Sequence, residues 1–167
     1  MFNDARYAEA AEFLNASILG SSAEYGQALR LMLAMPSLPR EQLTAFFQNV
    51  LEPAPDRPLG LRECTVAARF GCADLAFDQL IAALDTGRPI VLSLNVLPIP
   101  RSATLYLVFA TSQGAAFRAD QRFPRFCARV GLVDYWRTSG HWPDCAAEVP
   151  YDFKAECESA AAEISAT

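Results

Sequence analysis

Apolar residues recur every three or four positions along most of this 167-residue chain, which is the spacing of one face of an α-helix. Glycine and proline, the usual helix-ending residues, punctuate the pattern. The pattern predicts an all-α fold. The helices expected cover residues 4–19, 23–35, 40–51, 61–70, 73–84, 120–130 (with Asp120 as N-cap), 132–139 and 152–164.

The clearest element is a helical hairpin formed by residues 61–70 and 73–84, with its turn at Gly71. Its facing positions carry small residues, which let two helices approach closely; these are Ala67, Ala68, Ala76 and Ala83. The segment PAPDRPLG, residues 53–60, interrupts the helical pattern just before the hairpin. We expect a single domain over residues 1–167, with residues 53–60 as the candidate for a flexible or sub-domain boundary.

Residues 90–111 fit two structures. IVLSLNVL (90–97) and TLYLVFAT (104–111) are rich in β-branched and apolar residues, and PIPRSA between them is long enough for a hairpin loop. At this length, periodicity does not distinguish a buried strand from a buried helix. The helical context on both sides favours helix over β-hairpin.

The segment from Phe117 to Cys145 holds six aromatic residues, the only histidine and two of the five cysteines. Tyr135, Trp136 and Trp142 are expected to pack as the end cap of a helical stack, because such a stack must cover its last apolar face. A ligand-binding aromatic box is the less favoured interpretation of these three side chains.

This segment also resembles a known family. VGLVDYWRTSGHWPDC (130–145), preceded by FRADQRF (117–123), is similar to the C-terminal end of bacterial tetratricopeptide-repeat (TPR) regulatory proteins, which often carry a winged-helix or a cyclase domain at their other end. The match covers about 30 residues, and Gln121 stands where the family usually has proline. The resemblance implies a helical interaction or regulatory module without catalytic residues, and it also favours helix for residues 90–111.

A TPR repeat spans 34 residues, and this spacing separates both Pro55 from Pro89 and Phe46 from Leu80. The hairpin lacks the tryptophan and tyrosine of the TPR signature, so any repeats are degenerate. The architecture expected is an irregular TPR-like antiparallel helical array with a C-terminal capping segment, followed by an acidic tail over residues 144–167 that holds one helix.

Composition places the chain among folded proteins, with 52% hydrophobic and 20% charged residues. No apolar run reaches the roughly 18 residues that a membrane span needs, and the first residues lack the pattern of a signal peptide. These features predict a cytoplasmic protein that does not bind membranes. Five cysteines without CxxC spacing indicate reduced thiols.

The net charge of −5 argues against general affinity for nucleic acid. Arg122, Arg125 and Arg129 are nevertheless spaced to line one helical face, which Arg118 would extend only if the helix began before Asp120. Such a stripe is typical of a solvated face. It also suits a protein partner that is acidic, because arginine forms bidentate contacts with carboxylates. In a third interpretation, the acidic tail folds back and masks the stripe.

His141, Asp144 and Cys145 are residue types used in nucleophilic catalysis and zinc binding. Their spacing in one turn argues against both, and favours packing of Trp142 with a hydrogen bond from His141. Nucleotide-binding, hydrolase and metalloprotease motifs are absent from the sequence. The sequence therefore predicts no enzyme, no cofactor and no metal.

The function expected is a non-enzymatic TPR-like module for protein-protein interaction or regulation, derived from the effector end of a bacterial signalling or transcription regulator. Its candidate partner-binding residues are Arg118, Arg122, Arg125 and Arg129. One alternative is a helical sensory domain that binds a small ligand in a pocket lined by Tyr106 and Phe109. Another is a small enzyme that uses His141 and Cys145, and a third is the effector end of a longer chain.

Overall fold

A computed structural model describes residues 35–53, 57–92 and 104–166. Helices make up most of these ranges, which confirms the all-α class. The N-terminal helices predicted over 4–19 and 23–35 lie outside the described residues, apart from Met35. The described α-helices are α3 (Arg40–Leu51), α4 (Leu61–Arg69), α5 (Ala73–Thr86), α6 (Thr104–Ala110), α7 (Ala115–Arg118), α8 (Phe123–Arg129), α9 (Leu132–Ser139) and α10 (Phe153–Ser165).

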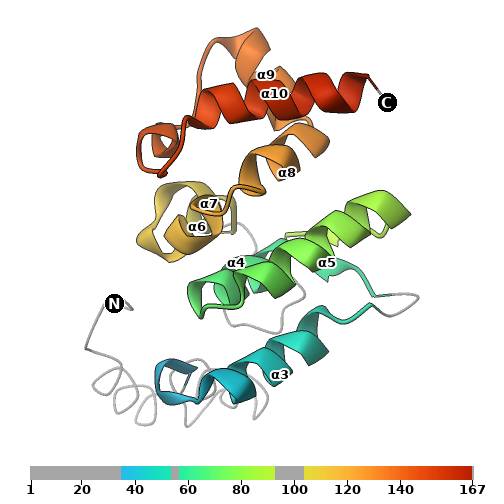
Figure 1. Cartoon of the computed structure of the whole chain (residues 1–167), viewed down its shortest axis with the longest axis vertical. Helices are drawn as coiled ribbons and strands as arrows, with labels where there is room; N and C mark the ends of the chain where they lie inside the picture. Colours follow the sequence, from blue (N-terminus) through green and yellow to red (C-terminus); the bar gives the residue numbers. More distant parts are fainter. Residues whose placement is uncertain (1–34, 54–56, 93–103, 167) are drawn as a thin grey trace, which may run out of the picture.

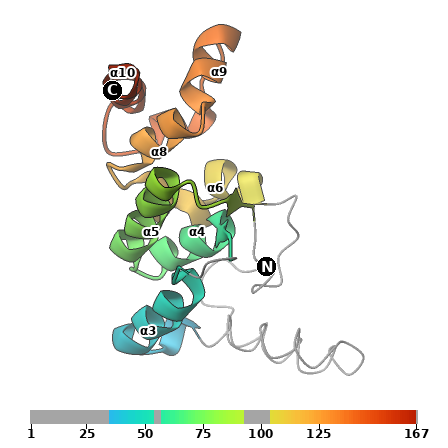
Figure 2. The same cartoon turned by 90° about the vertical axis from the view of Figure 1, so that its right-hand side faces the viewer.

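The helices form two layers. In one layer α3, α5, α8 and α10 follow one another and run in the same direction (Figure 1). Turned by a quarter (Figure 2), the molecule shows α4, α6 and α9 on the other side of this row. Short 3-10 turns complete the described chain: η1 (Met35–Ser37), η3 (Ser112–Gly114) and η4 (Asp144–Ala147). None of the helices in the described ranges is long and apolar enough to cross a membrane.

The predicted hairpin is present as α4 and α5. The small residues on its facing sides, Ala67, Ala68, Ala76 and Ala83, are at most 2% exposed, so the two helices do approach closely. Gly71 turns the chain with a φ of +83°, a conformation that residues with a Cβ rarely adopt. Helix α4 is the centre of the molecule, because every residue from Leu61 to Ala68 is buried.

The helix favoured for residues 90–97 is wrong at its start, because Ile90–Val91 form a short strand, β2. Strand β2 pairs in parallel with β1 (Leu59–Gly60), which closes the chain around the α4–α5 hairpin. The alternative of a β-hairpin between 90–97 and 104–111 is wrong as well, since 104–110 is helical. The strand partner lies 31 residues earlier in the chain, so no local pattern could reveal it. Residues 93–103 lie outside the described ranges.

Two arginines fasten the end of α3 to this β-pair. Arg88 donates hydrogen bonds to the carbonyls of Leu51, Glu52, Arg57 and Pro58. Arg57 donates to the carbonyls of Asn49 and Glu52. Cations suit this place, since the unpaired carbonyls at a helix C-terminus carry partial negative charge. The described part of the segment expected to be a flexible boundary is thus tied to its neighbours.

Two features of the C-terminal region agree with the sequence-based expectations, and one does not. Helix α9 covers the predicted 132–139. Helix α10 corresponds to the predicted 152–164, and Asp152 caps it by accepting a hydrogen bond from the amide of Ala155 at 3.1 Å. Helix α8, however, begins at Phe123 and not at Asp120. The Asp120 carboxylate instead accepts from the amide of Arg122 at 2.9 Å, which holds a turn before the helix.

The C-terminal half packs around aromatic rings. Phe117 of α7 stacks on Phe77 of α5 with ring centres 4.6 Å apart, and Phe123 lies between Phe117 and Phe153. Phe153 is buried, and the Tyr151 hydroxyl donates to the carbonyls of Arg118 and Asp120, so both residues anchor α10.

We expect the Arg88→Ala variant to lose about 1–2 kcal/mol of unfolding free energy, because the carbonyls it binds at the end of α3 lose a charged donor. Urea unfolding at neutral pH measures this loss. Arg40→Ala is the matched control, since Arg40 donates to a single carbonyl, that of Gly71, and is exposed. Equal stability of the two variants would contradict the fastening role of Arg88.

Candidate interaction surface

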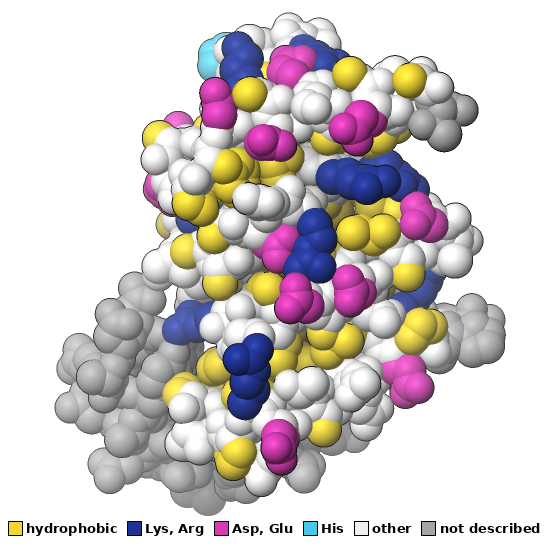
Figure 3. All heavy atoms as spheres, in the orientation of Figure 1, with side chains coloured by type: hydrophobic (Ala, Val, Ile, Leu, Met, Phe, Trp, Pro, Cys, Tyr) yellow, Lys and Arg dark blue, Asp and Glu magenta, His cyan; other side chains and the backbone are white. Residues whose placement is uncertain are grey.

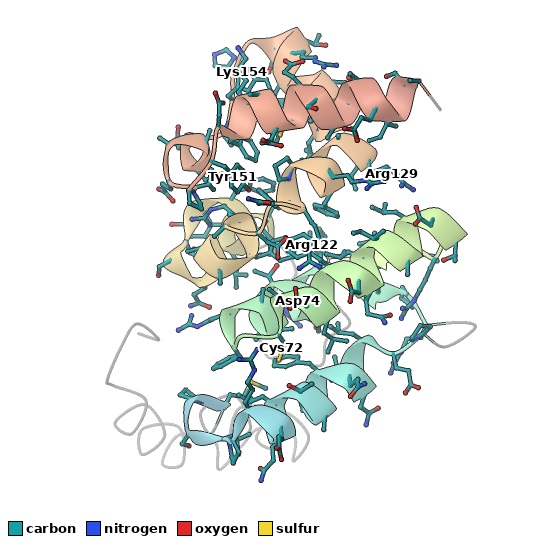
Figure 4. The ribbon with its side chains drawn as sticks, viewed as in Figure 1. Cys72, Asp74, Arg122, Arg129, Tyr151 and Lys154 are labelled. Atoms are coloured by element: carbon teal, nitrogen blue, oxygen red, sulfur yellow. The ribbon has the colours of Figure 1, made fainter. Side chains whose placement is uncertain are left out.

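A row of opposite charges lies between α5 and α8, and we call it the charged seam. Asp74 and Asp78 of α5 pair with Arg122, just before α8, and Asp85 pairs with Arg129 within α8. Arg125 lies between these two arginines in the sequence. Figure 3 shows acidic and basic side chains gathered across the middle of this face. Figure 4 shows Arg122 lying between α8 and Asp74 of α5. The seam joins segments that are 44 to 48 residues apart in sequence.

Arg122 makes the largest number of contacts in the seam. Its guanidinium contacts Asp74 at 2.8 Å and Asp78 at 3.3 Å, and lies 5.0 Å from the centre of the Phe77 ring. It also binds both oxygens of Asp120, at 2.8 and 2.7 Å. The hydrogen bonds that Arg122 donates to Asp120 and Asp74 outweigh the effect of burial and raise the pKa of Arg122. This side chain is therefore a structural joint between α5 and the turn that precedes α8.

The other two arginines differ from each other. Arg129 pairs with Asp85 at 2.8 Å and its side chain is 24% exposed. Arg125 is exposed and makes no ion pair or side-chain hydrogen bond within the described ranges. The register explains this. Arg122 pairs with Asp78, and Arg129 pairs with Asp85, each seven positions further along its helix. By this register Arg125 is level with Ile81 and Ala82, where α5 has no carboxylate.

The fourth candidate, Arg118, does not belong to the seam. It ends α7, is only 2% exposed, and donates to the carbonyls of Val108 and Thr111 and to the Glu148 carboxylate. The tight packing needs glycine at position 114, because a Cβ there would lie 2.4 Å from the Val108 carbonyl oxygen. Arg118 holds α6, α7 and η4 together and does not extend the arginine stripe.

The arginine stripe carries no excess of positive charge. Its three arginines face four carboxylates, since Asp120 joins the three from α5. In the third interpretation the acidic tail masks the stripe, but Arg122 and Arg129 are paired with carboxylates of α5. From the tail, Glu148 pairs with Arg118 and Glu158 with Arg137. Sequence reasoning missed Asp74, Asp78 and Asp85, although the spacing of Asp74 and Asp78 already placed them along the polar side of the helix predicted over 73–84. Asp85 lies just past the predicted end of that helix.

The residues considered for catalysis do not form a nucleophilic pair. His141 is exposed, and its Nδ1 lies 2.7 Å from the Ser139 carbonyl oxygen. Burial raises the pKa of the Cys145 thiol, the opposite of what a nucleophile needs. Trp142 packs on Trp136 and Phe153. This geometry agrees with the packing interpretation of the turn.

All five cysteines are buried free thiols, and within the described ranges no group of candidate ligands could hold a metal.

The structure also shows where the aromatic residues lie that were expected to line a pocket or to cap the helical stack. Tyr106 is 65% exposed, whereas Phe109 packs against Phe123 and Trp136, so these two side chains do not line a common pocket. Trp136 is buried in the C-terminal core as expected. Tyr135 is 64% exposed and is therefore not part of the packed cap.

Comparisons with known proteins add no evidence on function to the geometry described above. No family model matches the sequence, and neither the search of curated proteins nor the search of solved structures found a match.

The Asp120 contacts predict a dependence of stability on pH. Burial alone would raise the pKa of this carboxyl, but hydrogen bonds from the Arg122 side chain and amide outweigh it and lower the pKa. Asp120 therefore contributes stability above its ordinary pKa, and the contribution is lost as pH falls through the lowered value. We expect the unfolding free energy of wild type to exceed that of Asp120→Asn at pH 7, and the difference to shrink below about pH 4.

Urea unfolding of both proteins from pH 7 to pH 3 measures this difference. Asp134→Asn is the control, because its carboxylate is 79% exposed and contacts Arg137 at 3.3 Å; we expect an effect below about 0.5 kcal/mol at every pH. A wild-type advantage over Asp120→Asn that stays constant down to pH 3 would refute the role given to Asp120.

Proposed function

We propose that the protein is a non-enzymatic helical module that binds a protein partner along the face of α5 and α8, with Arg125 as the main contact. The observation that carries this proposal is the split within the arginine stripe. Arg122 and Arg129 are bound to carboxylates of the same chain, whereas Arg125 is exposed between them without one. A guanidinium in this state is free to bind a group of another molecule.

The arrangement of the helices supports the same function. Helices α3, α5, α8 and α10 are stacked in one direction and present one continuous face (Figure 1). Stacked helical arrays with such faces commonly bind proteins. A regulatory role, as in the TPR-containing regulators that residues 117–145 resemble, is the form of this function that we favour.

The alternatives weighed from the sequence have less support. A ligand pocket lined by Tyr106 and Phe109 would require these side chains to converge, and one is exposed while the other lies in the aromatic core. An enzyme that uses Cys145 would require an accessible thiol of lowered pKa, and this thiol is buried. Interaction through the helical face needs no rearrangement of the described residues.

Affinity capture from the native host tests the proposal. The full chain is immobilised as wild type, as Arg125→Glu, and as Lys154→Glu, which reverses another exposed cation, one that lies over the Trp142 ring. We expect a specific protein to be retained by wild type and by Lys154→Glu, and its affinity for Arg125→Glu, measured with purified proteins, to fall at least tenfold.

Circular dichroism checks that each variant is folded. Reversal of Arg122 or Arg129 is avoided, since both hold α5 to the C-terminal half and their loss would confuse binding with stability. Failure of wild type to retain any specific protein would overturn the proposed function. A partner that binds Arg125→Glu as tightly as wild type would remove Arg125 from the contact.

A further inference from the structure

The charges of the seam do not cancel evenly along its length. At its start, Asp74, Asp78 and Asp120 share one cation, Arg122. Asp120 takes the closest contacts and is largely buried, whereas the side chains of Asp74 and Asp78 are 92% and 70% exposed. Asp74 lies in the first turn of α5. This end of the seam therefore presents excess negative charge to solvent.

The middle of the seam has the opposite sign. Arg125 lies one helical turn further along α8, and the facing positions of α5 are Ile81 and Ala82, which carry no charge. At the far end, Arg129 and Asp85 form a balanced pair. The exposed seam thus has, in order along α5 and α8, a negative site, a positive site and a neutral site. Arg122 and Arg125 are separated by about 4.5 Å along the helix axis.

From this order we infer that the partner is a protein segment carrying both signs of charge, which lies in the seam along α5 and α8. Its basic residue contacts Asp74 and Asp78, and its acidic residue, about one helical turn away, contacts Arg125. A helix with a Lys or Arg and an Asp or Glu three or four positions apart has this pattern. This inference rests on the proposed function and specifies the partner's chemistry.

A purely acidic segment fits the seam less well. It would meet Arg125, but it would also lie against the exposed carboxylates of Asp74 and Asp78, and like charges placed side by side across an interface are costly. A purely basic segment would meet the same difficulty at Arg125. Only a segment with both signs, in the right order, leaves no exposed charge of the seam facing a like charge.

Site-specific photo-crosslinking in the native host tests this inference. A benzoyl-phenylalanine is placed in the full chain at Ala82, which is exposed opposite Arg125, and in separate variants at Tyr106 and Tyr135, which are exposed on α6 and α9. The crosslinked peptide is identified by mass spectrometry. We expect a crosslink at Ala82 to a peptide with a basic and an acidic residue within four positions, and a reduction of at least fivefold on adding Arg125→Glu.

Arg125→Lys is the conservative control and should keep the crosslink at Ala82. A crosslinked peptide with charges of one sign, or without charges, would overturn the inference and leave the proposed function standing. Crosslinks at Tyr106 or Tyr135 with none at Ala82 would show that the protein binds its partner elsewhere, and would also overturn it. No crosslink at any of the three positions would count against the proposed function itself.

Discussion

The guanidinium of Arg122 joins two parts of the molecule that the chain itself keeps far apart. It lies over Phe77 and binds Asp74 and Asp78 of the hairpin, and from the same atoms it binds Asp120 in the turn before α8. The Phe77–Phe117 stack is the apolar part of the same joint. With this joint in place, α8 lies parallel to α5, and α10, which packs on α8, completes the row of helices (Figure 1). The surface available to a partner depends on this alignment.

The alignment of α5 and α8 also determines which arginine stays exposed without a carboxylate partner. Because the spacing of Asp78 and Asp85 matches that of Arg122 and Arg129, these charges are paired and Arg125 meets two uncharged side chains. An isolated helix would present all three arginines equally. The fold thus converts a uniform stripe into one exposed cation beside two exposed carboxylates, which is a pattern that a partner can recognise by the order of its charges.

Much of the fold was predictable from local signals. Helix α3 begins directly after Pro39, α9 ends just before Gly140, and the spacing of the alanines in α4 and α5 is enough to indicate that these two helices lie in close contact. The β1–β2 pair was not predictable, since it joins two-residue strands 31 positions apart. The start of α8 was misplaced because an aspartate three residues before a helix can cap either the helix or a preceding turn.

The candidate site was only half predictable. Helical spacing identified Arg122, Arg125 and Arg129 as one face, but only the packing of α5 against α8 shows that two of them are neutralised. Arg118 could not be assigned from sequence, because its burial depends on contacts with Val108 in α6, Thr111 just after α6 and Glu148 just after η4. The spacing of the arginines suggested a basic helical face, and the fold brings acidic residues from α5 to the same place.

The most direct test of this account compares the unfolding free energies of Arg122→Ala and Arg125→Ala in urea at neutral pH. If Arg122 is the joint and Arg125 is free for a partner, the first substitution costs about 2 kcal/mol and the second less than about 0.5 kcal/mol. Equal costs for the two substitutions, or a larger cost at Arg125, would contradict the division of roles on which the proposed surface rests.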